Sequence, residues 1–357
     1  MKRICVSIRV ILMLGIIVCN QVVIGQRIVL KEDMSSDDLR SLLEGKYSGT
    51  IDAIQHLARG ISYPGAVAVA YVAHSHIDTA VDMLIGMGEI NLDKVESDIE
   101  KAISSALTSI FKTTIAKARA SKKHEVSHSL FAISPWNKKI VWNKAKTHVL
   151  MVTWVPGAYK APYINALNSK EPMTIQWDAW VTAVPELKEF AQNYLASRAT
   201  AKFKLTDRIE QYLGLIPSKP PYAKTQDKYF VEMWVKLEDL ARPCIDAEVI
   251  DGECVMDPYE EDLASLPPAF RDMSKLVPMT TAHKIWFENE KKNKYSGEWA
   301  MPWTRFGYTY DWGALKKMDQ EKLTVQGASE YLIKKGSNVI INSVTPTDDY
   351  PDLVETP

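Results

Sequence analysis

The chain has 357 residues, of which 46% are hydrophobic and 24% are charged, and its formal net charge at pH 7 is −1. A chain of this length buries about three quarters of its unfolded surface, so it folds without a metal or a disulfide network to hold it together. The near-neutral charge supplies no positive field for a phosphate backbone, and we therefore predict no nucleic-acid partner.

The first 25 residues have the pattern of a secretory signal peptide. Lys2 and Arg3 precede an apolar run over residues 10–18, and the small residue Gly25 closes a cleavage site. The run is shorter than the roughly 20 apolar residues that cross a bilayer. We therefore predict an exported protein, periplasmic or extracellular, with no membrane association after signal cleavage. Lipid attachment at Cys19 and retention as a signal anchor are the alternatives.

The region 26–125 is predicted to be mainly helical. Serines and aspartates at 35–38 are typical of a helix start. Residues 93–120 contain neither glycine nor proline, and their apolar side chains recur at spacings of three and four, which predicts one long amphipathic helix. The alanine-rich stretch 66–73 fits either a buried strand or a helix.

The region 126–346 is predicted to be an α+β module, in which strands alternate with short helices. A helix is expected from Pro185, because a residue without an amide hydrogen suits the first helical position, and another over 207–213. Strands are predicted at 139–142, 148–155, 177–184, 229–236, 328–334 and 339–344, with the first two and the last two forming hairpins.

These elements together predict an α+β fold, with a helical N-terminal segment followed by a mixed, partly antiparallel sheet and short helices. Residues 347–357 contain four acidic side chains and are predicted to form a loose acidic tail.

Four segments of the α+β region resemble blocks of an uncharacterised bacterial protein family. They lie at 180–190, 230–244, 302–313 and 327–347. The resemblance covers residues 130–350 in outline and leaves the helical N-terminal part out. It implies that this region is one module, and it brings no activity and no catalytic residue with it.

Cys244 and Cys254 are the two cysteines that remain after signal cleavage. Two nearby cysteines in an exported chain predict one disulfide, and closing so short a loop is worth about 2.8 kcal/mol in a simple entropy model. Free thiols are an alternative. A metal site is disfavoured, because zinc sites usually space their thiols two to four residues apart.

His124, Glu125 and His128 fit the H-E-x-x-H motif of zinc hydrolases. On a helix both imidazoles could ligate zinc while Glu125 activates the bound water, with Glu186 or Glu189 as a third ligand. However, the apolar stripe of the long helix fades before the motif, which favours a solvated loop that holds two histidines by chance. A metallopeptidase-like zinc hydrolase is therefore the alternative function, and no cofactor is predicted otherwise.

The segment from 286 to 312 is unusually aromatic, with nine aromatic residues among 27. In a strand, the alternating rings at positions 306, 308, 310 and 312 would share one face, and such a ladder can stack on a sugar or hold an extended peptide. The competing interpretation is that the rings form the inner face of a sheet. The predicted binding residues are Trp299, Trp303, Arg305, Tyr308, Tyr310, Asp311 and Trp312.

The sequence contains no P-loop, no dinucleotide-binding fingerprint and no G-x-S-x-G nucleophile elbow. The best functional prediction is therefore an exported, non-enzymatic protein that binds a carbohydrate or a peptide through the aromatic segment. This hypothesis predicts that Tyr308→Ala or Trp312→Ala leaves the fold largely intact. A scaffold without any pocket is the third possibility.

Overall fold

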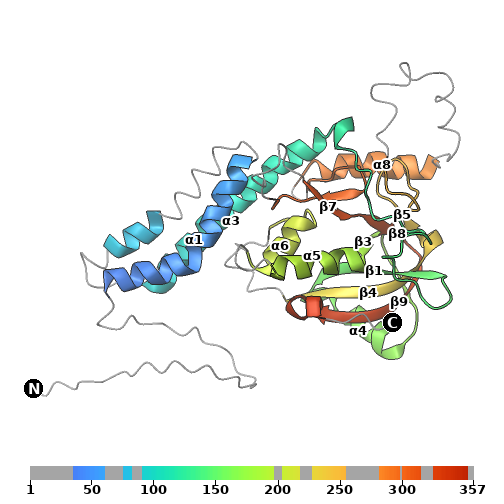
Figure 1. Cartoon of the computed structure of the whole chain (residues 1–357), viewed down its shortest axis with the longest axis horizontal. Helices are drawn as coiled ribbons and strands as arrows, with labels where there is room; N and C mark the ends of the chain where they lie inside the picture. The colour runs from blue at the N-terminus through green and yellow to red at the C-terminus, as the bar shows by residue number, and fades with distance from the viewer. Residues whose placement is uncertain are drawn as a thin grey trace, which may run out of the picture.

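The computed structural model describes residues 35–60, 75–82, 91–196, 203–217, 227–254, 281–297, 300–314 and 325–352. A helical N-terminal region lies beside a body built on a seven-stranded sheet, so the predicted α+β class is confirmed (Figure 1). The predicted signal peptide and Trp299 lie outside the described residues. Within the described part of the chain, no helix is long and apolar enough to cross a membrane.

The N-terminal region consists of α1 (Ser36–Gly60), a helical stretch at 75–82 and α3 (Leu92–Arg119). The predicted start of α1 is a capping box, in which the Ser35 hydroxyl accepts the Asp38 amide hydrogen at 3.1 Å and the Asp38 carboxylate accepts the Ser35 amide hydrogen at 3.2 Å. The three helices share one apolar core, whose members include Leu39, Leu43, Ile51, Ile54, Ile77, Ile99 and Ile110.

The body contains a sheet with the strand order β2-β9-β4-β1-β3-β8-β5, in which every strand pair is antiparallel. The strands are β1 (His148–Pro156), β2 (Met173–Thr174), β3 (Ala179–Ala183), β4 (Lys228–Lys236), β5 (Leu240–Ala241), β8 (Tyr331–Ile333) and β9 (Asn338–Pro346). The central pair, β1 and β4, is matched along its whole length. A separate antiparallel pair is formed by β6 (Tyr308–Tyr310) and β7 (Gln326–Ser329).

Helices cover both faces of the large sheet, because side chains along each strand alternate between the faces. One face is covered by α4 (Ala161–Ser169) and by the loops around Ile133 and Val249. The other is covered by α5 (Val184–Ala196), α6 (Leu205–Tyr212) and the short 3-10 helix η5 (Thr347–Asp352). The remaining helix, α8 (Thr281–Lys294), packs through Phe287. Three further 3-10 turns are η1 (Lys123–Glu125), η2 (Gly157–Tyr159) and η3 (Leu237–Asp239).

Three local predictions differ from the structure. The predicted C-terminal hairpin is wrong, because β4, β1 and β3 lie between β8 and β9, and the turn at 334–337 bonds instead to Ile175. Residues 139–142 form no strand, although Trp142 makes a single antiparallel bridge to Val149. The first part of the predicted loose tail is η5, in which the fully buried Tyr350 stacks on Phe230 at 4.1 Å between ring centroids.

Candidate functional site

The aromatic segment is buried rather than exposed. Trp303, Tyr308, Tyr310 and Trp312 are each at most 4% exposed, so these rings offer no open face to a ligand. They also do not form a ladder on one face. Tyr310 and Trp312 join the core of the N-terminal helices, Tyr308 joins a core beside the disulfide, and Trp303 packs on α8.

The expected ladder fails because the backbone of the segment leaves the extended conformation. Arg305 and Gly307 have φ values of 67° and 71°, in the left-handed region. Regular alternation of side chains therefore does not continue through residues 304–308, and only Tyr308–Tyr310 forms a strand. The interpretation of these rings as core is the one that the geometry supports.

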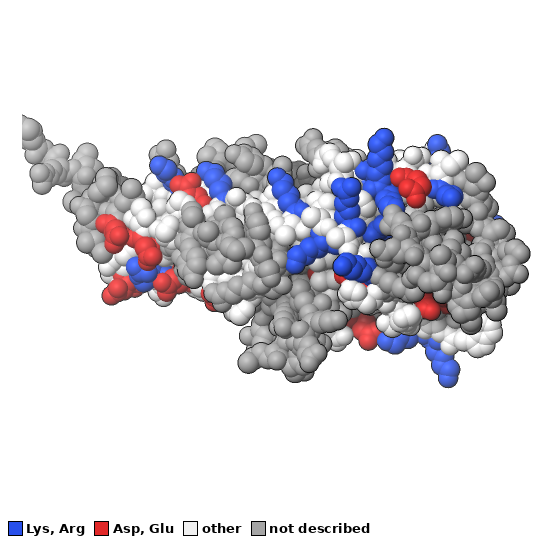
Figure 2. Space-filling model, turned by 90° about the horizontal axis from the view of Figure 1, so that it is seen from above, with Lys and Arg blue, Asp and Glu red and all other residues white. Residues whose placement is uncertain are grey.

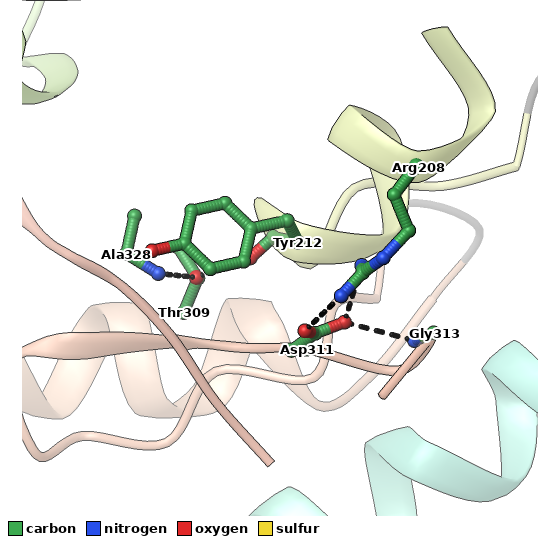
Figure 3. Close-up of polar contacts among 6 residues, drawn as sticks. All are labelled: Arg208, Tyr212, Thr309, Asp311, Gly313 and Ala328. Carbon is green, nitrogen blue, oxygen red and sulfur yellow. Dashed lines mark hydrogen bonds and ion pairs between the residues drawn. The ribbon is translucent and has the colours of Figure 1, made fainter. Parts of the chain in front are cut away.

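Asp311, a predicted ligand-binding residue, is committed to an internal ion pair (Figure 3). Its two carboxylate oxygens accept hydrogen bonds from the Arg208 guanidinium of α6 at 2.8 and 2.6 Å, and one of them also accepts the Gly313 amide hydrogen at 3.0 Å. In the same view, the Thr309 hydroxyl accepts the amide hydrogen of Ala328 at 2.8 Å. These contacts attach β6 to α6 and β7 and leave the carboxylate no role at the surface.

Arg305 occupies a different position, at the end of α3. Its side chain is 9% exposed, and its Nη2 donates to the carbonyl oxygens of Arg119 at 3.1 Å and Ser121 at 3.5 Å. These carbonyls are among the groups that a helix C-terminus leaves without partners. Within the described part of the chain, Arg305 pairs with no carboxylate, and its Nε has no hydrogen-bond partner. The hydrogen bonds of this buried cation are therefore to neutral carbonyl groups.

An open groove of 610 Å³ lies directly beside this end of α3. We call it the α3–α8 groove and define it by its lining residues, which are Lys112, Ile115, Ala116, Arg119, Ala120, Tyr295, Ser296, Gly297 and Ala300. Positions 112, 115, 116 and 119 fall on one helical face, as the spacing of an α-helix requires. The volume lies within the range of known ligand sites.

The groove lies close to the buried Arg305. Arg305 bonds to the carbonyl of Arg119, whose residue lines the groove. Its guanidinium carbon lies 6.0 Å from the centre of the Tyr295 ring, and the Tyr295 hydroxyl donates to the Trp303 carbonyl. Arg305, which the sequence predicts as a binding residue of the aromatic strand, thus lies behind this groove and not in an aromatic ladder.

The surface around the groove is basic. No acidic residue occurs between Glu100 and Glu125, whereas six lysines or arginines do. Seen from above, Lys and Arg side chains gather over the middle of the molecule, where α3 and α8 lie (Figure 2). Among the residues that the structure describes, the side chains of Lys112, Lys117 and Arg119 enter no ion pair.

A helix C-terminus explains only some of these cations. Positive side chains stabilise the last turn of a helix by interacting with its dipole, and this effect falls off within that turn. Lys117 and Arg119 lie in the last turn of α3, but Lys112 lies two turns from its end. Lys112 is therefore a cation on the groove that the helix dipole does not account for.

The H-E-x-x-H segment does not form the expected metal-binding helix. Only Lys123–Glu125 is helical, as a single 3-10 turn, and the Glu125 carboxylate accepts the Lys122 amide hydrogen at 2.7 Å. His128 Nδ1 lies 2.7 Å from Glu253 Oε2. The two histidines are therefore not one α-helical turn apart, and the prediction of a loop is the correct one.

The other proposed zinc ligands are also engaged elsewhere. The Glu186 carboxylate accepts hydrogen bonds from the Ser329 amide and hydroxyl, both at 3.0 Å, and Glu189 pairs with Lys139 at 2.9 Å. In the described ranges, no group of three or more His, Cys, Asp or Glu side chains could hold a metal ion. The residues of the H-E-x-x-H segment thus do not fit a zinc centre.

The predicted disulfide between Cys244 and Cys254 is present. Both cysteines are fully buried and pack with Leu130, Phe306 and Tyr308. The disulfide therefore fixes the loop that it closes against the inner side of the aromatic segment.

Two buried carboxyl groups have pKa values above that of a free glutamate. Burial raises the pKa of Glu186 to about 7 and the pKa of Glu330 to about 8. Glu330 Oε2 is buried without a hydrogen-bond partner among the described residues. Neither carboxyl group lines the α3–α8 groove. Sequence reasoning did not single out Glu330, because nothing in its local pattern marks it as a buried acid.

Models of protein families, curated proteins and solved structures show no significant match to this chain. No role can therefore be assigned to the groove residues by analogy. The sequence signal that could have identified the groove is the run from 101 to 124, which contains no acidic residue. The sequence prediction followed the aromatic composition of 286–312 instead.

Proposed function

We propose that the protein is an exported, non-enzymatic binding protein that holds a peptide or a carbohydrate in the α3–α8 groove. The observation that carries this proposal is the open, basic groove itself. Lys112 and Arg119 line it without forming ion pairs among the described residues, and the uncompensated charge of Arg305 lies behind it. Charged groups held without partners at a concave surface favour binding of a ligand that supplies the missing charge.

The chemistry of the lining residues supports binding rather than catalysis. As far as the structure describes it, the lining contains no His, Cys, Asp or Glu, the residues that most often serve as general bases or nucleophiles. Ser296 Oγ donates to the Lys292 carbonyl, and the Tyr295 hydroxyl is engaged by Trp303. Burial also raises the pKa of Tyr295, so that the phenol stays protonated near neutral pH.

Export is supported by the signal-like pattern at the N-terminus and by the disulfide. Disulfides persist in oxidising compartments and are rare in the cytosol. A structural disulfide between Cys244 and Cys254 thus agrees with a binding protein that acts outside the cytoplasm, in the periplasm or beyond the cell.

The test is to fill the groove without changing the fold. Ala116 is exposed and lines the groove, so Ala116→Trp is expected to block it. Lys117→Trp is the matched control, because Lys117 is the next residue and faces away from the lining stripe. The mature protein and both variants are applied to arrays of peptides and of oligosaccharides, with circular dichroism as a check on folding.

We expect at least one class of array ligand to bind the mature protein and the Lys117→Trp variant, and binding to fall more than tenfold in Ala116→Trp. Binding that Ala116→Trp leaves unchanged would contradict the groove as the site. If neither array contains a ligand, the binding function itself is contradicted.

A further inference from the structure

We infer that the ligand of the α3–α8 groove is an acidic peptide segment, bound in an extended conformation with two carboxylates three residues apart. This inference rests on the proposed function and names the ligand class of the same site. It assigns Lys112 and Arg119 as the residues that bind the two carboxylates.

The first argument is charge. Two cations line the groove and a third, Arg305, lies behind it, while no Asp or Glu is among the lining residues that the structure describes. Charge-assisted hydrogen bonds between a guanidinium and a carboxylate are stronger than neutral ones, and Arg119 can form two such bonds in parallel. A negatively charged ligand thus compensates charges that the described part of the chain leaves unpaired.

The end of α3 does not repel such a ligand. The last carbonyl groups of a helix carry a partial negative charge that disfavours anions. Here Arg305 donates to the carbonyl oxygens of Arg119 and Ser121, so these groups are already occupied by a cation. The helix terminus is therefore compatible with a carboxylate beside Arg119.

The second argument is spacing. Lys112 and Arg119 are seven residues apart on one face of α3, which places their Cα atoms about 10 Å apart along the helix axis. A peptide in the polyproline II conformation advances about 3.1 Å per residue and returns to the same side every third residue. Acidic side chains at positions i and i+3 therefore project in the same direction about 9 Å apart, which matches the two cations.

The third argument favours a peptide over a carbohydrate. Sugars are usually held against the exposed face of an aromatic ring. Among the described lining residues Tyr295 is the one aromatic residue, and its ring packs on Trp303 at 6.4 Å between centroids. Between the two cations the lining is aliphatic, with Ile115 and Ala116, which suits the apolar side chains that a peptide carries between its acidic residues.

The experiment measures fluorescence anisotropy with four labelled probes and the full mature chain. The probes are a peptide with glutamates at i and i+3, the same peptide with glutamines, a peptide with adjacent glutamates, and an oligogalacturonate as an acidic carbohydrate. The variants are Lys112→Gln/Arg119→Gln and, as a control on the same helix, Lys117→Gln. Each substitution removes one exposed cation, and a circular dichroism melt checks that the variants are folded.

We expect the i, i+3 glutamate peptide to bind most tightly and the double variant to weaken its binding about tenfold, since surface charge pairs are modest individually. Lys117→Gln should stay within twofold of the unsubstituted protein, because its side chain lies off the groove. Equal binding of the glutamine peptide, tighter binding of the oligogalacturonate, or an equal loss in Lys117→Gln overturns the inference.

The two proposals fail in different ways. If the acidic peptide shows no preference but another ligand is still displaced by Ala116→Trp, the binding function stands and the ligand class is wrong. If no probe and no array ligand depends on Ala116, both proposals are wrong.

Discussion

At the scale of single residues, several ion pairs are buried where α5 and α6 pack on the body. The side chains of Arg208 and Asp311 are 12% and 6% exposed, and those of Lys188 and Glu232 are 7% and 4% exposed. Removing one member of such a pair leaves an uncompensated charge in the interior, which is much more costly than removing both. The Arg208–Asp311 pair links α6 to the residue that follows β6, and losing either partner alone is expected to cost more than losing both.

Arg208→Met is expected to lower the free energy of unfolding by about 3–5 kcal/mol, because it leaves the buried Asp311 carboxylate without a cationic partner. Arg208→Met/Asp311→Leu should recover most of that loss. Lys139→Met is the control, since Lys139 and Glu189 form an exposed pair worth at most about 1 kcal/mol. Urea unfolding measures all three variants, and a loss in Arg208→Met no larger than in the control would contradict the buried-pair argument.

The buried carboxyl groups predict a pH dependence of stability. The folded-state pKa values of Glu186 and Glu330 are about 7 and 8, above the value of 4.5 for a free glutamate. Between pH 4.5 and 8 the folded protein holds protons that the unfolded chain has lost, so the free energy of unfolding falls as the pH rises through this interval. Below pH 4.5 both states are protonated and the two groups contribute their full stability.

Glu330→Gln tests this pH dependence more directly than a substitution of Glu186, because Glu330 Oε2 has no hydrogen-bond partner to lose among the described residues. We expect the substitution to flatten the decline between pH 5 and 8 and to raise the free energy of unfolding at pH 8 by about 1–3 kcal/mol. Urea titrations at several pH values measure this. An unchanged pH slope would show that the Glu330 carboxyl group is not buried in the neutral form.

At the scale of secondary-structure elements, the sequence predicts best what local spacing determines. The long helix expected at 93–120 is α3, and the strand expected at 229–236 is β4, because periodicity of apolar residues specifies both. The C-terminal hairpin is wrong for the opposite reason. Residues 328–334 and 339–344 look like neighbouring strands, but their partners, β3 and β4, are distant in sequence.

The candidate site shows the same limit. Alternation in 306–312 correctly marks an apolar segment, but it cannot tell a solvent-facing ring from a buried one when both sides of the strand are covered. Arg305 was predicted as a ligand-binding residue on this basis, and its place behind the groove follows from a contact with α3, more than 180 residues earlier in the chain. Lys112 and Tyr295 are far apart in the sequence, so only the folded structure shows that both line the groove.

At the scale of the whole molecule, residues 300–314 connect the helical region to the sheet body. The Trp312 ring contacts Phe111 of α3 edge-on at 5.9 Å, and its Nε1 donates to the Leu215 carbonyl at 3.0 Å, just after α6. Trp303 joins α8 to the same segment. The groove is thus formed where these regions meet, and its shape depends on their staying docked.

This connection reverses the mutational outcome expected from the sequence. Trp312→Ala should not leave the fold intact, because removing a buried indole costs about 3–5 kcal/mol and this one bridges two regions. Circular dichroism at 222 nm follows the helices of both regions, including the long α1 and α3. Tryptophan fluorescence follows residues 136–312, which hold all ten tryptophans, and not the helices α1 and α3 themselves. Both signals should shift to lower denaturant together, as one cooperative transition.

Trp136→Ala is the control for that experiment. Trp136 is 83% exposed, so its removal should change the midpoint of the denaturant unfolding transition little. If Trp312→Ala were as stable as the control, the indole would not be a core residue. If the two signals separated already in the unsubstituted protein, the helical region and the sheet body would unfold independently. The α3–α8 groove would then open and close with the docking of α3, and ligand affinity would fall wherever that docking is lost.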